Sequence, residues 1–317
     1  MIIENTNVDL TQKPSFCQTP VTGSTGLNVL SLFDGMSCGQ IALQKAGIKV
    51  NQYFASEIKP HAIKVTQHNF PNTIQLGSVL DVKAIDLPKI DLLIGGSPCQ
   101  DFSSANKEKL GLQGEKSGLF YEYLRLLKEC EPKYFLLENV AMDDYSYATI
   151  SEMLGTYPTN INSELVSGQL RQRSYWTNIG PESFDLFGNR YSMIPQPRNK
   201  KIKFQDVLEN GYTDRLKARC ILESESRPLV SKDKLFRRYN ELGFINIVFD
   251  NPNCEYNENI RILTQTELER LQTVPEGYTS LLKRNDAACL LGDGWTVDVI
   301  AHIFSFIEVE CSNYAQS

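Results

Sequence analysis

Residues 90–102 read Ile-Asp-Leu-Leu-Ile-Gly-Gly-Ser-Pro-Cys-Gln-Asp-Phe, and this stretch decides the fold. The apolar run at 92–94 is typical of a strand that is buried on both faces, as in a parallel sheet. Two glycines end the run, since glycine lets the backbone turn and lets another group approach closely. Pro98 then restricts the backbone that leaves the strand. Cys99 follows it beyond the carboxyl end of the strand, where α/β sheets bind ligands. The pattern predicts a displayed nucleophile at Cys99, although most cysteines after strands pack as small hydrophobes.

Upstream of this stretch the sequence predicts a strand, a glycine loop and a helix. Residues 28–33 form the expected strand, and 40–46 form the expected helix, which Gly47 closes. This order is the nucleotide-binding arrangement of doubly wound folds, although two loop glycines alone do not specify a cofactor. This order of elements therefore predicts an open α/β sheet.

Two carboxylates follow the next predicted strands. Glu57 ends the strand expected at 52–56, roughly twenty residues after the glycine loop, where an acidic side chain can bind both hydroxyls of a ribose. Asp81 follows the strand expected at 73–77. It is interpreted either as an acceptor for an adenine amino group or as a helix cap.

Polar residues also follow later strands. Residues 103–116 read as a flexible loop that can close over a substrate. The apolar strand expected at 134–137 runs directly into Glu138, and a carboxylate there is costly unless it has a partner or a task. Further on, alternation along an extended chain places Gln169, Arg171 and Arg173 on one side.

Composition excludes several classes of protein. The chain has 317 residues, 41% of them hydrophobic and 22% charged, which is ordinary for a soluble globular protein. It contains no apolar run of about 18 residues, so no membrane span is expected. The eight cysteines are scattered without metal-ligand spacing, and the three histidines do not cluster, so no metal is expected. The polar N-terminus lacks a signal pattern, which favours a reducing, cytoplasmic location.

Charge is unevenly distributed along the chain. The net charge of -6 argues against a polyanionic partner, but residues 196–245 contain twelve Lys and Arg against seven Asp and Glu. That segment carries a local +5, which leaves -11 for the remainder. A basic segment on an acidic body is expected of a surface that binds nucleic acid.

Together, these residues resemble the S-adenosylmethionine-dependent DNA cytosine-5 methyltransferases. The resemblance covers 28–179 and 259–307. Its motifs occur in the family's order: Phe33-Asp34-Gly35, Glu57, Asp81, Gly96-Ser97-Pro98-Cys99-Gln100, Glu138-Asn139-Val140, 169–173, 261–272 and the turn at Gly292.

The resemblance implies a fold and a division into domains. The fold would be α/β, a Rossmann-like class I methyltransferase with a mostly parallel, doubly wound sheet and a small target-recognition domain inserted near the C-terminus. We expect an N-terminal extension at 1–27, a catalytic and cofactor-binding domain at 28–180, the target-recognition domain at 181–258, and a return to the catalytic domain at 259–317.

The family also implies roles for four catalytic residues. Cys99 would add to C6 of cytosine, because C5 becomes nucleophilic only after such an addition. Glu138 would hold or protonate N3, and Arg173 would contact O2. Arg171 would support the thiolate and the glutamate. The target base would have to be flipped out of the duplex.

Further site residues follow from the same resemblance. S-adenosylmethionine is the expected cofactor and double-stranded DNA the expected partner, with a cognate restriction endonuclease as a second candidate. A location on the nucleoid would follow if the chain is prokaryotic or phage-encoded. The expected cofactor contacts are Phe33, Asp34, Gly35, Met36, Glu57, Ile58, Asp81, Val82, Pro98 and Trp295, and the expected substrate contacts are Ser97, Gln100 and Gln169.

Some details and alternatives remain open at this point. Asp34 and Trp295 resemble the eukaryotic de novo branch more than the usual bacterial enzymes, and Gly-Asp-Gly at 292–294 departs from the common Gly-Asn. A tRNA cytosine-5 methyltransferase is the first alternative, although the chain lacks the Cys-Phe-Thr tripeptide of that branch. A catalytically silent homologue that binds DNA or a partner is the second. A thymidylate-synthase-like enzyme also uses a Pro-Cys nucleophile, but the glycine loop and Glu57 favour an adenosyl cofactor.

Overall fold

The computed structural model describes residues 26–97, 118–222, 231–243 and 245–308. Pro98, Cys99 and Gln100, the loop predicted at 103–116 and nearly all of the predicted N-terminal extension lie outside these ranges.

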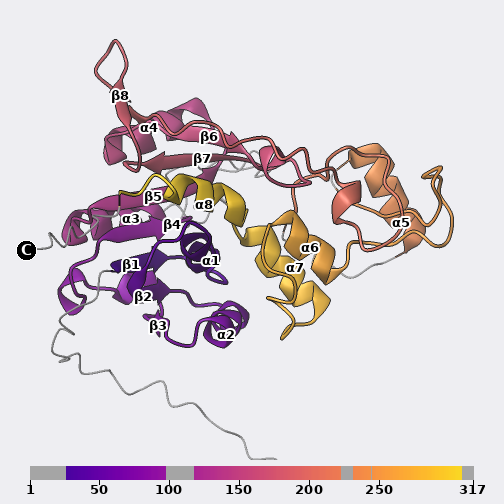
Figure 1. Cartoon of the computed structure of the whole chain (residues 1–317), viewed down its shortest axis with the longest axis horizontal. Coiled ribbons are helices and arrows are strands. Elements are labelled where there is room, and N and C mark those ends of the chain that lie inside the picture. The colour runs from indigo at the N-terminus through magenta and orange to yellow at the C-terminus, as the bar shows by residue number, and fades with distance from the viewer. Residues whose placement is uncertain (1–25, 98–117, 223–230, 244, 309–317) are drawn as a thin grey trace, which may run out of the picture.

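A seven-stranded mixed sheet forms the centre of the molecule (Figure 1), in the order β3-β2-β1-β4-β5-β7-β6. The strands β1 to β5 pair in parallel, and β7 runs antiparallel to both of its neighbours. The chain passes from β1 to β2 on one side and returns to β4 on the other, and α/β folds bind ligands in the crevice outside the carboxyl ends of the strands at such a switch point. The strands are β1 (Leu27–Leu32), β2 (Val50–Ser56), β3 (Ile74–Gln75), β4 (Leu92–Gly95), β5 (Tyr134–Val140), β6 (Thr159–Asn162) and β7 (Gln172–Thr177).

Helices cover both faces of this sheet, as the doubly wound prediction requires. Successive residues of β1, Val29 and Leu30, belong to two different core clusters, one on each face. Burial on both faces explains why the strands are continuously apolar. The helices around the sheet are α1 (Cys38–Lys45), α2 (Pro60–Asn69), α3 (Gly118–Cys130), α4 (Asp144–Leu154) and α8 (Val297–Phe304), with 3-10 turns η1 (Val79–Asp81), η2 (Ala84–Asp86) and η4 (Ser163–Leu165).

The second half of the chain adds a smaller unit beside the sheet. Figure 1 shows α5 beyond α6 and α7, on the side of the molecule away from the sheet. A separate apolar cluster, which includes Leu235, Tyr239 and Phe249, forms the core of this unit. Its elements and neighbours are η5 (Gln205–Val207), α5 (Lys232–Arg237), the short π-helix η7 (Arg238–Leu242), α6 (Gln265–Leu271) and α7 (Arg284–Asp293), while β8 (Glu182–Phe184) and β9 (Arg190–Ser192) form a hairpin.

The predicted target-recognition domain does not coincide with that second core. Phe204 and Ile221 lie inside the range 181–258 but pack in the main core, whereas Ile260 lies beyond it and packs in the second core. The boundaries at 180/181 and 258/259 therefore stay a prediction.

One helical stretch, Arg284–Phe304, has the length and mean hydropathy of a membrane span. It consists of α7 and α8, separated at 294–296, and 61% of its apolar window is buried inside the protein. Burial of this kind is what a core helix of a soluble domain shows.

Candidate active site

The carboxyl edge brings Glu138 and Arg173 together. Glu138 lies near the end of β5, only 9% exposed, directly opposite Tyr175 of β7. Arg173 is two residues from Tyr175 and so lies on the same face as Glu138, as the alternation predicts. The Arg173 Nε lies 3.0 Å from Glu138 Oε1. An arginine that holds a nearly buried carboxylate is a strong, oriented pair.

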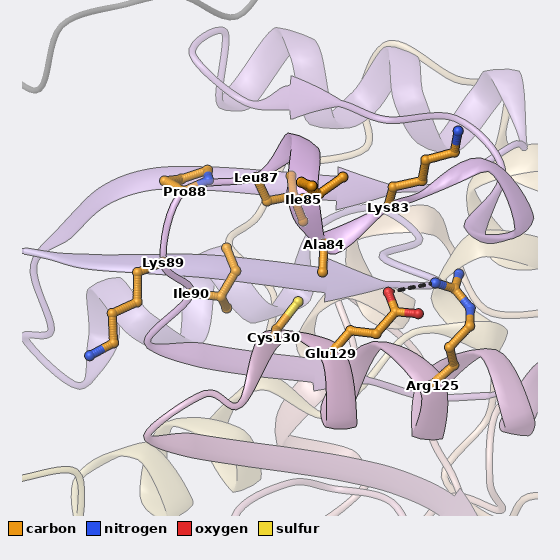
Figure 2. Close-up of a pocket in the computed structure, with 10 residues that line it drawn as sticks. All are labelled: Lys83, Ala84, Ile85, Leu87, Pro88, Lys89, Ile90, Arg125, Glu129 and Cys130. Carbon is orange, nitrogen blue, oxygen red and sulfur yellow. Dashed lines mark hydrogen bonds and ion pairs between the residues drawn. The ribbon is translucent and has the colours of Figure 1, made fainter.

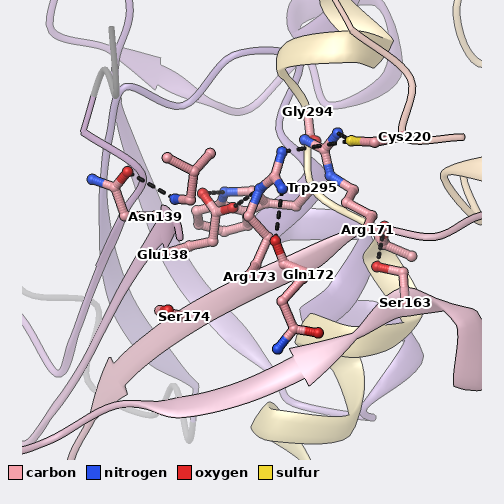
Figure 3. Close-up of polar contacts among 12 residues, drawn as sticks. Glu138, Asn139, Ser163, Arg171, Gln172, Arg173, Ser174, Cys220, Gly294 and Trp295 are labelled. Atoms are coloured by element: carbon pink, nitrogen blue, oxygen red, sulfur yellow. Dashed lines mark hydrogen bonds and ion pairs between the residues drawn. The ribbon is translucent and has the colours of Figure 1, made fainter. Parts of the chain in front are cut away.

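The other oxygen of Glu138 is also held. Trp295 donates its indole Nε1 hydrogen to Glu138 Oε2 at 3.1 Å (Figure 3). Gly96 lies against both groups, because a Cβ there would come within 3.0 Å of Glu138 Oε2 and of Trp295 Nε1. The backbone before the Pro-Cys segment therefore passes directly beside the Glu138 carboxylate, and only a glycine leaves the present space between them.

Neighbouring polar contacts fix the same strand ends. The Asn139 Nδ2 donates to Ser97 Oγ at 3.2 Å, and Asn139 Oδ1 accepts from the Val140 backbone at 2.8 Å. Both Ser97 and Asn139 are buried. Ser97, predicted to contact substrate, thus joins the end of β4 to the end of β5, and its predicted contact with substrate is not tested.

Arg171 binds backbone and sulfur rather than carboxylate among the described residues. Its guanidinium donates to Ile221 O at 3.0 Å, to Gly292 O at 3.2 Å and to Gly294 O at 2.8 Å, and it contacts Cys220 Sγ at 3.2 Å. It is 3% exposed. These contacts brace the turn before Trp295, while support of the Cys99 thiolate stays a prediction.

Gln169 is fully buried. Its Nε2 donates to Leu271 O at 2.6 Å and to Gln272 Oε1 at 2.8 Å, and its Oε1 accepts from the Ile221 backbone at 3.3 Å. These bonds make Gln169 a structural link between β7 and α6. The predicted contact of Gln169 with substrate is not tested.

On the other side of the crevice, Glu57 is bound by backbone groups. One carboxylate oxygen accepts from the Ile58 and Lys59 backbones, and the other accepts from the Gly35 backbone, each at 2.8 Å. A carboxylate has about four acceptor positions, so Oε2 retains one. The loop after β1 and the end of β2 are thereby locked together with an acceptor facing the edge.

Asp34 lies next to this anchor, half-buried among hydroxyl groups. Tyr53 donates to it at 2.7 Å, and Ser37 donates to its other oxygen. Burial raises the pKa of Asp34 to about 6, and hydrogen bonds from Ser31, Ser37 and Tyr53 offset part of that rise. Phe33 just before it has a positive φ of 57°, a strained conformation that is frequent at functional sites.

The remaining predicted cofactor residues divide into exposed and buried ones. Ile58 is 70% exposed, and Asp81 is also exposed at the end of η1. Met36 and Val82 are buried in the core, although the Met36 carbonyl accepts from the Tyr278 hydroxyl at 2.7 Å. An exposed isoleucine between two acidic strand ends offers an apolar face with polar borders.

Two further features lie apart from the Glu138–Arg173 pair. Cys38 is buried, and burial raises the pKa of its thiol to about 12, so it is not a nucleophile near neutral pH. A cavity of about 630 Å³ lies between Lys83–Ile90 and the end of α3, lined by residues including Arg125 and Cys130 (Figure 2). It is near the amino ends of β4 and β5, away from Glu138. No group of three or more metal-binding side chains occurs in the described ranges.

The fold is that of the class I methyltransferases. A putative DNA modification methyltransferase encoded within a prophage of E. coli has a similar structure, with a TM-score of 0.62 at 20% identity, covering 88% of this chain and 98% of that one. Residues 27–154 match the model of the C-5 cytosine-specific DNA methylase family. Over these residues the predicted resemblance to that family is confirmed.

Two curated relatives support the same assignment. The orphan methyltransferase M.Rho11sI of Bacillus phage rho11s is 40% identical over 198 residues, which are 58% of this chain and 37% of that protein. The type II methyltransferase M.NlaIV of Neisseria lactamica is 37% identical over 215 residues, which are 65% of this chain and 49% of that protein. The matches thus span half or less of these relatives. The predicted likeness of Asp34 and Trp295 to the eukaryotic de novo branch stays a prediction.

Proposed function

We propose that the protein is a DNA cytosine-5 methyltransferase that transfers a methyl group from S-adenosylmethionine to C5 of a flipped cytosine. The observation that carries the proposal is Glu138, held between Arg173 and Trp295 and directly beside Gly96, which leads into Ser-Pro-Cys. An acidic group, a guanidinium and a cysteine nucleophile are the three groups that this reaction requires at the base.

Each group has one task in the proposed mechanism. The Cys99 thiolate forms a bond to C6, and the electron pair of the C5–C6 double bond is displaced toward N3 and O2. Glu138 gives a proton to N3 as charge develops there, and Arg173 stabilises the charge at O2. The C5 carbon would then take the methyl group, whose bond to the sulfonium sulfur would break with the electron pair left on sulfur. The N3 proton returns to Glu138 when the ring is restored. A base, for which water suffices, removes the C5 proton, the double bond reforms and Cys99 leaves.

The loop side of the crevice fits the expected cofactor. S-adenosylmethionine supplies an electrophilic methyl group on a sulfonium sulfur. Glu57 keeps an acceptor position for ribose hydroxyls, Ile58 offers an apolar face for adenine, and Asp81 offers an acceptor for its amino group.

Exposed basic side chains support a nucleic-acid substrate. Several lie in or near the smaller unit: Arg198, Lys201, Lys203, Arg219, Lys232, Lys234 and Arg237. Lysine and arginine release counterions from DNA, so binding should weaken steeply between about 50 and 200 mM salt. We propose that the segment 181–258 carries sequence choice, and grafting it into a related enzyme should change the target of that enzyme. A cognate restriction endonuclease is proposed as a partner, and a cytoplasmic, nucleoid-associated location is proposed with it.

The deciding experiment is mechanism-based trapping. Duplex DNA with 5-fluorocytosine at the target should form an adduct that survives denaturing electrophoresis and depends on S-adenosylmethionine. Fluorine cannot leave as a proton does, so Cys99 cannot be eliminated. Cys99→Ser should abolish both adduct and turnover, because a hydroxyl is far less ionised than a thiol. Cys130→Ser, which lies by the cavity of Figure 2, is the matched control and should retain both.

Other outcomes separate the alternatives. An adduct that persists in Cys99→Ser would place the nucleophile elsewhere. Methylation of tRNA with duplex DNA untouched would identify the RNA branch instead. Protein that binds DNA and cofactor but methylates no cytosine would be a silent homologue.

A further inference from the structure

A cysteine from the segment after β9 lies between the two arginines of the site. The Cys220 Sγ contacts Arg171 Nη1 at 3.2 Å and Arg173 Nη2 at 3.8 Å, and the thiol faces the Ile221 carbonyl at 3.5 Å. Figure 3 shows Cys220 beside the guanidinium groups, on the side away from Asn139. The sulfur therefore serves as a common acceptor for two groups of like charge.

These contacts form a closed ring of residues, and Glu138 is one member of it. Arg171 donates to the Gly294 carbonyl at 2.8 Å, and the next residue, Trp295, donates its indole to Glu138. Glu138 pairs with Arg173, and Arg173 returns to Cys220. Each member of the ring thus contacts the next, and Cys220 is the member that lies in the predicted target-recognition segment.

Arg173 depends on this ring for its orientation. Its Nε faces Glu138, and its Nη1 donates to the Gln172 carbonyl at 2.8 Å, which belongs to the preceding residue. The contact of Nη2 with Cys220 comes from outside the sheet, from a residue 47 positions away. An arginine side chain has much rotamer freedom, so a third anchor narrows the positions of its planar group.

We propose that Cys220 is a positioning residue through which the target-recognition segment orients Arg173 against Glu138. The inference rests on the proposed function, because it assigns Arg173 to O2 of the flipped cytosine. A shift of the 220–221 backbone would move both arginines, and so would couple the fit of the DNA target to the geometry of the Glu138 pair.

The test compares four substitutions in the full chain. Cys220→Val fills the space without an acceptor, Cys220→Ala empties it, Cys220→Ser keeps an acceptor, and Cys130→Ala is the control at a remote half-buried cysteine. We expect Cys220→Val and Cys220→Ala to lower kcat by roughly three- to tenfold, the effect of one ordinary hydrogen bond, because sulfur is a weak acceptor. The KM for S-adenosylmethionine should stay unchanged, and Cys220→Ser should recover most of kcat.

Two results would overturn the proposal. The first is full activity in Cys220→Val, which would mean that Cys220 only fills space. The second is an equal loss in the serine and alanine variants, which would mean that no acceptor is needed at this position.

A second readout needs no turnover. The chain has two tryptophans, and Trp176 is fully buried, so a change in emission that is specific to this site reports on Trp295. Loss of the ring should change the emission in Cys220→Val and Cys220→Ala but not in Cys130→Ala. If wild-type protein methylates no cytosine, the proposed function fails, and the emission still decides whether Cys220 holds the ring. Identical emission in wild-type protein and all four variants would refute the positioning role of Cys220.

Discussion

The two sides of the catalytic crevice hold carboxylates in different ways. On the β1–β2 side, Glu57 is bound by backbone N–H groups and Asp34 by hydroxyls. On the β5–β7 side, Glu138 is bound by a guanidinium and an indole. Strand ends place all three at one edge, but their partners differ. Neutral partners make a rigid frame for hydroxyl and amino groups of a cofactor, whereas the cationic partner of Glu138 suits a site where charge develops.

The largest expected effect tests the β5–β7 side. Glu138→Gln should reduce the rate of methylation by roughly 10²- to 10⁴-fold, because the amide cannot transfer a proton to N3 of the cytosine. DNA and cofactor binding should persist, since the amide fills the same space. Single-turnover methylation and equilibrium binding measure the two effects. A rate close to that of wild type would remove Glu138 from the chemistry.

The next effect tests the β1–β2 side. Glu57→Ala and Asp81→Ala should each weaken S-adenosylmethionine by about 1.5–3 kcal/mol, the value of a hydrogen bond to a charged group. DNA affinity should change much less. Calorimetry with cofactor measures this, and Glu152→Ala, an exposed acid on α4, is the control. Unchanged cofactor affinity in both variants would contradict the assignment of this side.

On the β1–β2 side, Asp34 makes the free energy of unfolding depend on pH. Its pKa in the folded protein, about 6, lies above the ordinary value of 3.8. The folded state therefore binds the proton of the Asp34 carboxyl more tightly than the unfolded state does. The protonated carboxyl stabilises the folded state below about pH 4, and this stabilisation is lost as pH rises to about 6. The free energy of unfolding of Asp34→Asn relative to wild type should rise by about 1–3 kcal/mol across that window. Urea unfolding between pH 4 and 8 measures the difference.

The control for Asp34→Asn is the substitution Asp86→Asn, which changes an exposed acid in η2. A difference between Asp34→Asn and wild type that does not change with pH would show that Asp34 does not titrate in this range.

The smallest effect concerns the link between the two sides. Lys59, whose backbone binds Glu57, forms an ion pair at 2.7 Å with Asp293, two residues before Trp295. Both side chains are about half exposed, so the pair is screened by water and salt. Lys59→Ala should change the free energy of unfolding by less than about 1 kcal/mol. A larger loss in thermal or urea unfolding would mean that the two sides are rigidly coupled at the surface.

Local patterns were enough to predict most of the sheet. Buried strands are continuously apolar, whereas the pairing of Glu138 with Arg173 depends on the register of β5 against β7. The helix Gly118–Cys130 has an apolar stripe that is visible in the sequence, and Thr264 with Glu267, three residues on, forms a capping box at the start of α6. These features depend on neighbours in the chain.

Contacts between distant segments could not be predicted. Trp295 meets Glu138 across 157 residues, and Cys220 meets Arg173 across 47. The helix α4 was missed because its buried positions include Ser146 and Ser151, which bond locally to Asp143 and to the Tyr147 carbonyl instead of forming an apolar stripe. The strand expected at 73–77 is limited to Ile74–Gln75. Such outcomes depend on tertiary packing.

Gly96 has a consequence for how this sequence can evolve. A methyl group at this position would come within 3.0 Å of two atoms that already bond to each other, Glu138 Oε2 and Trp295 Nε1. Replacing Gly96 by alanine first would crowd both groups, whereas replacing Trp295 by a small residue first would remove one of the two close contacts. The effect of a substitution at either position therefore depends on the residue at the other, which makes the two positions epistatic.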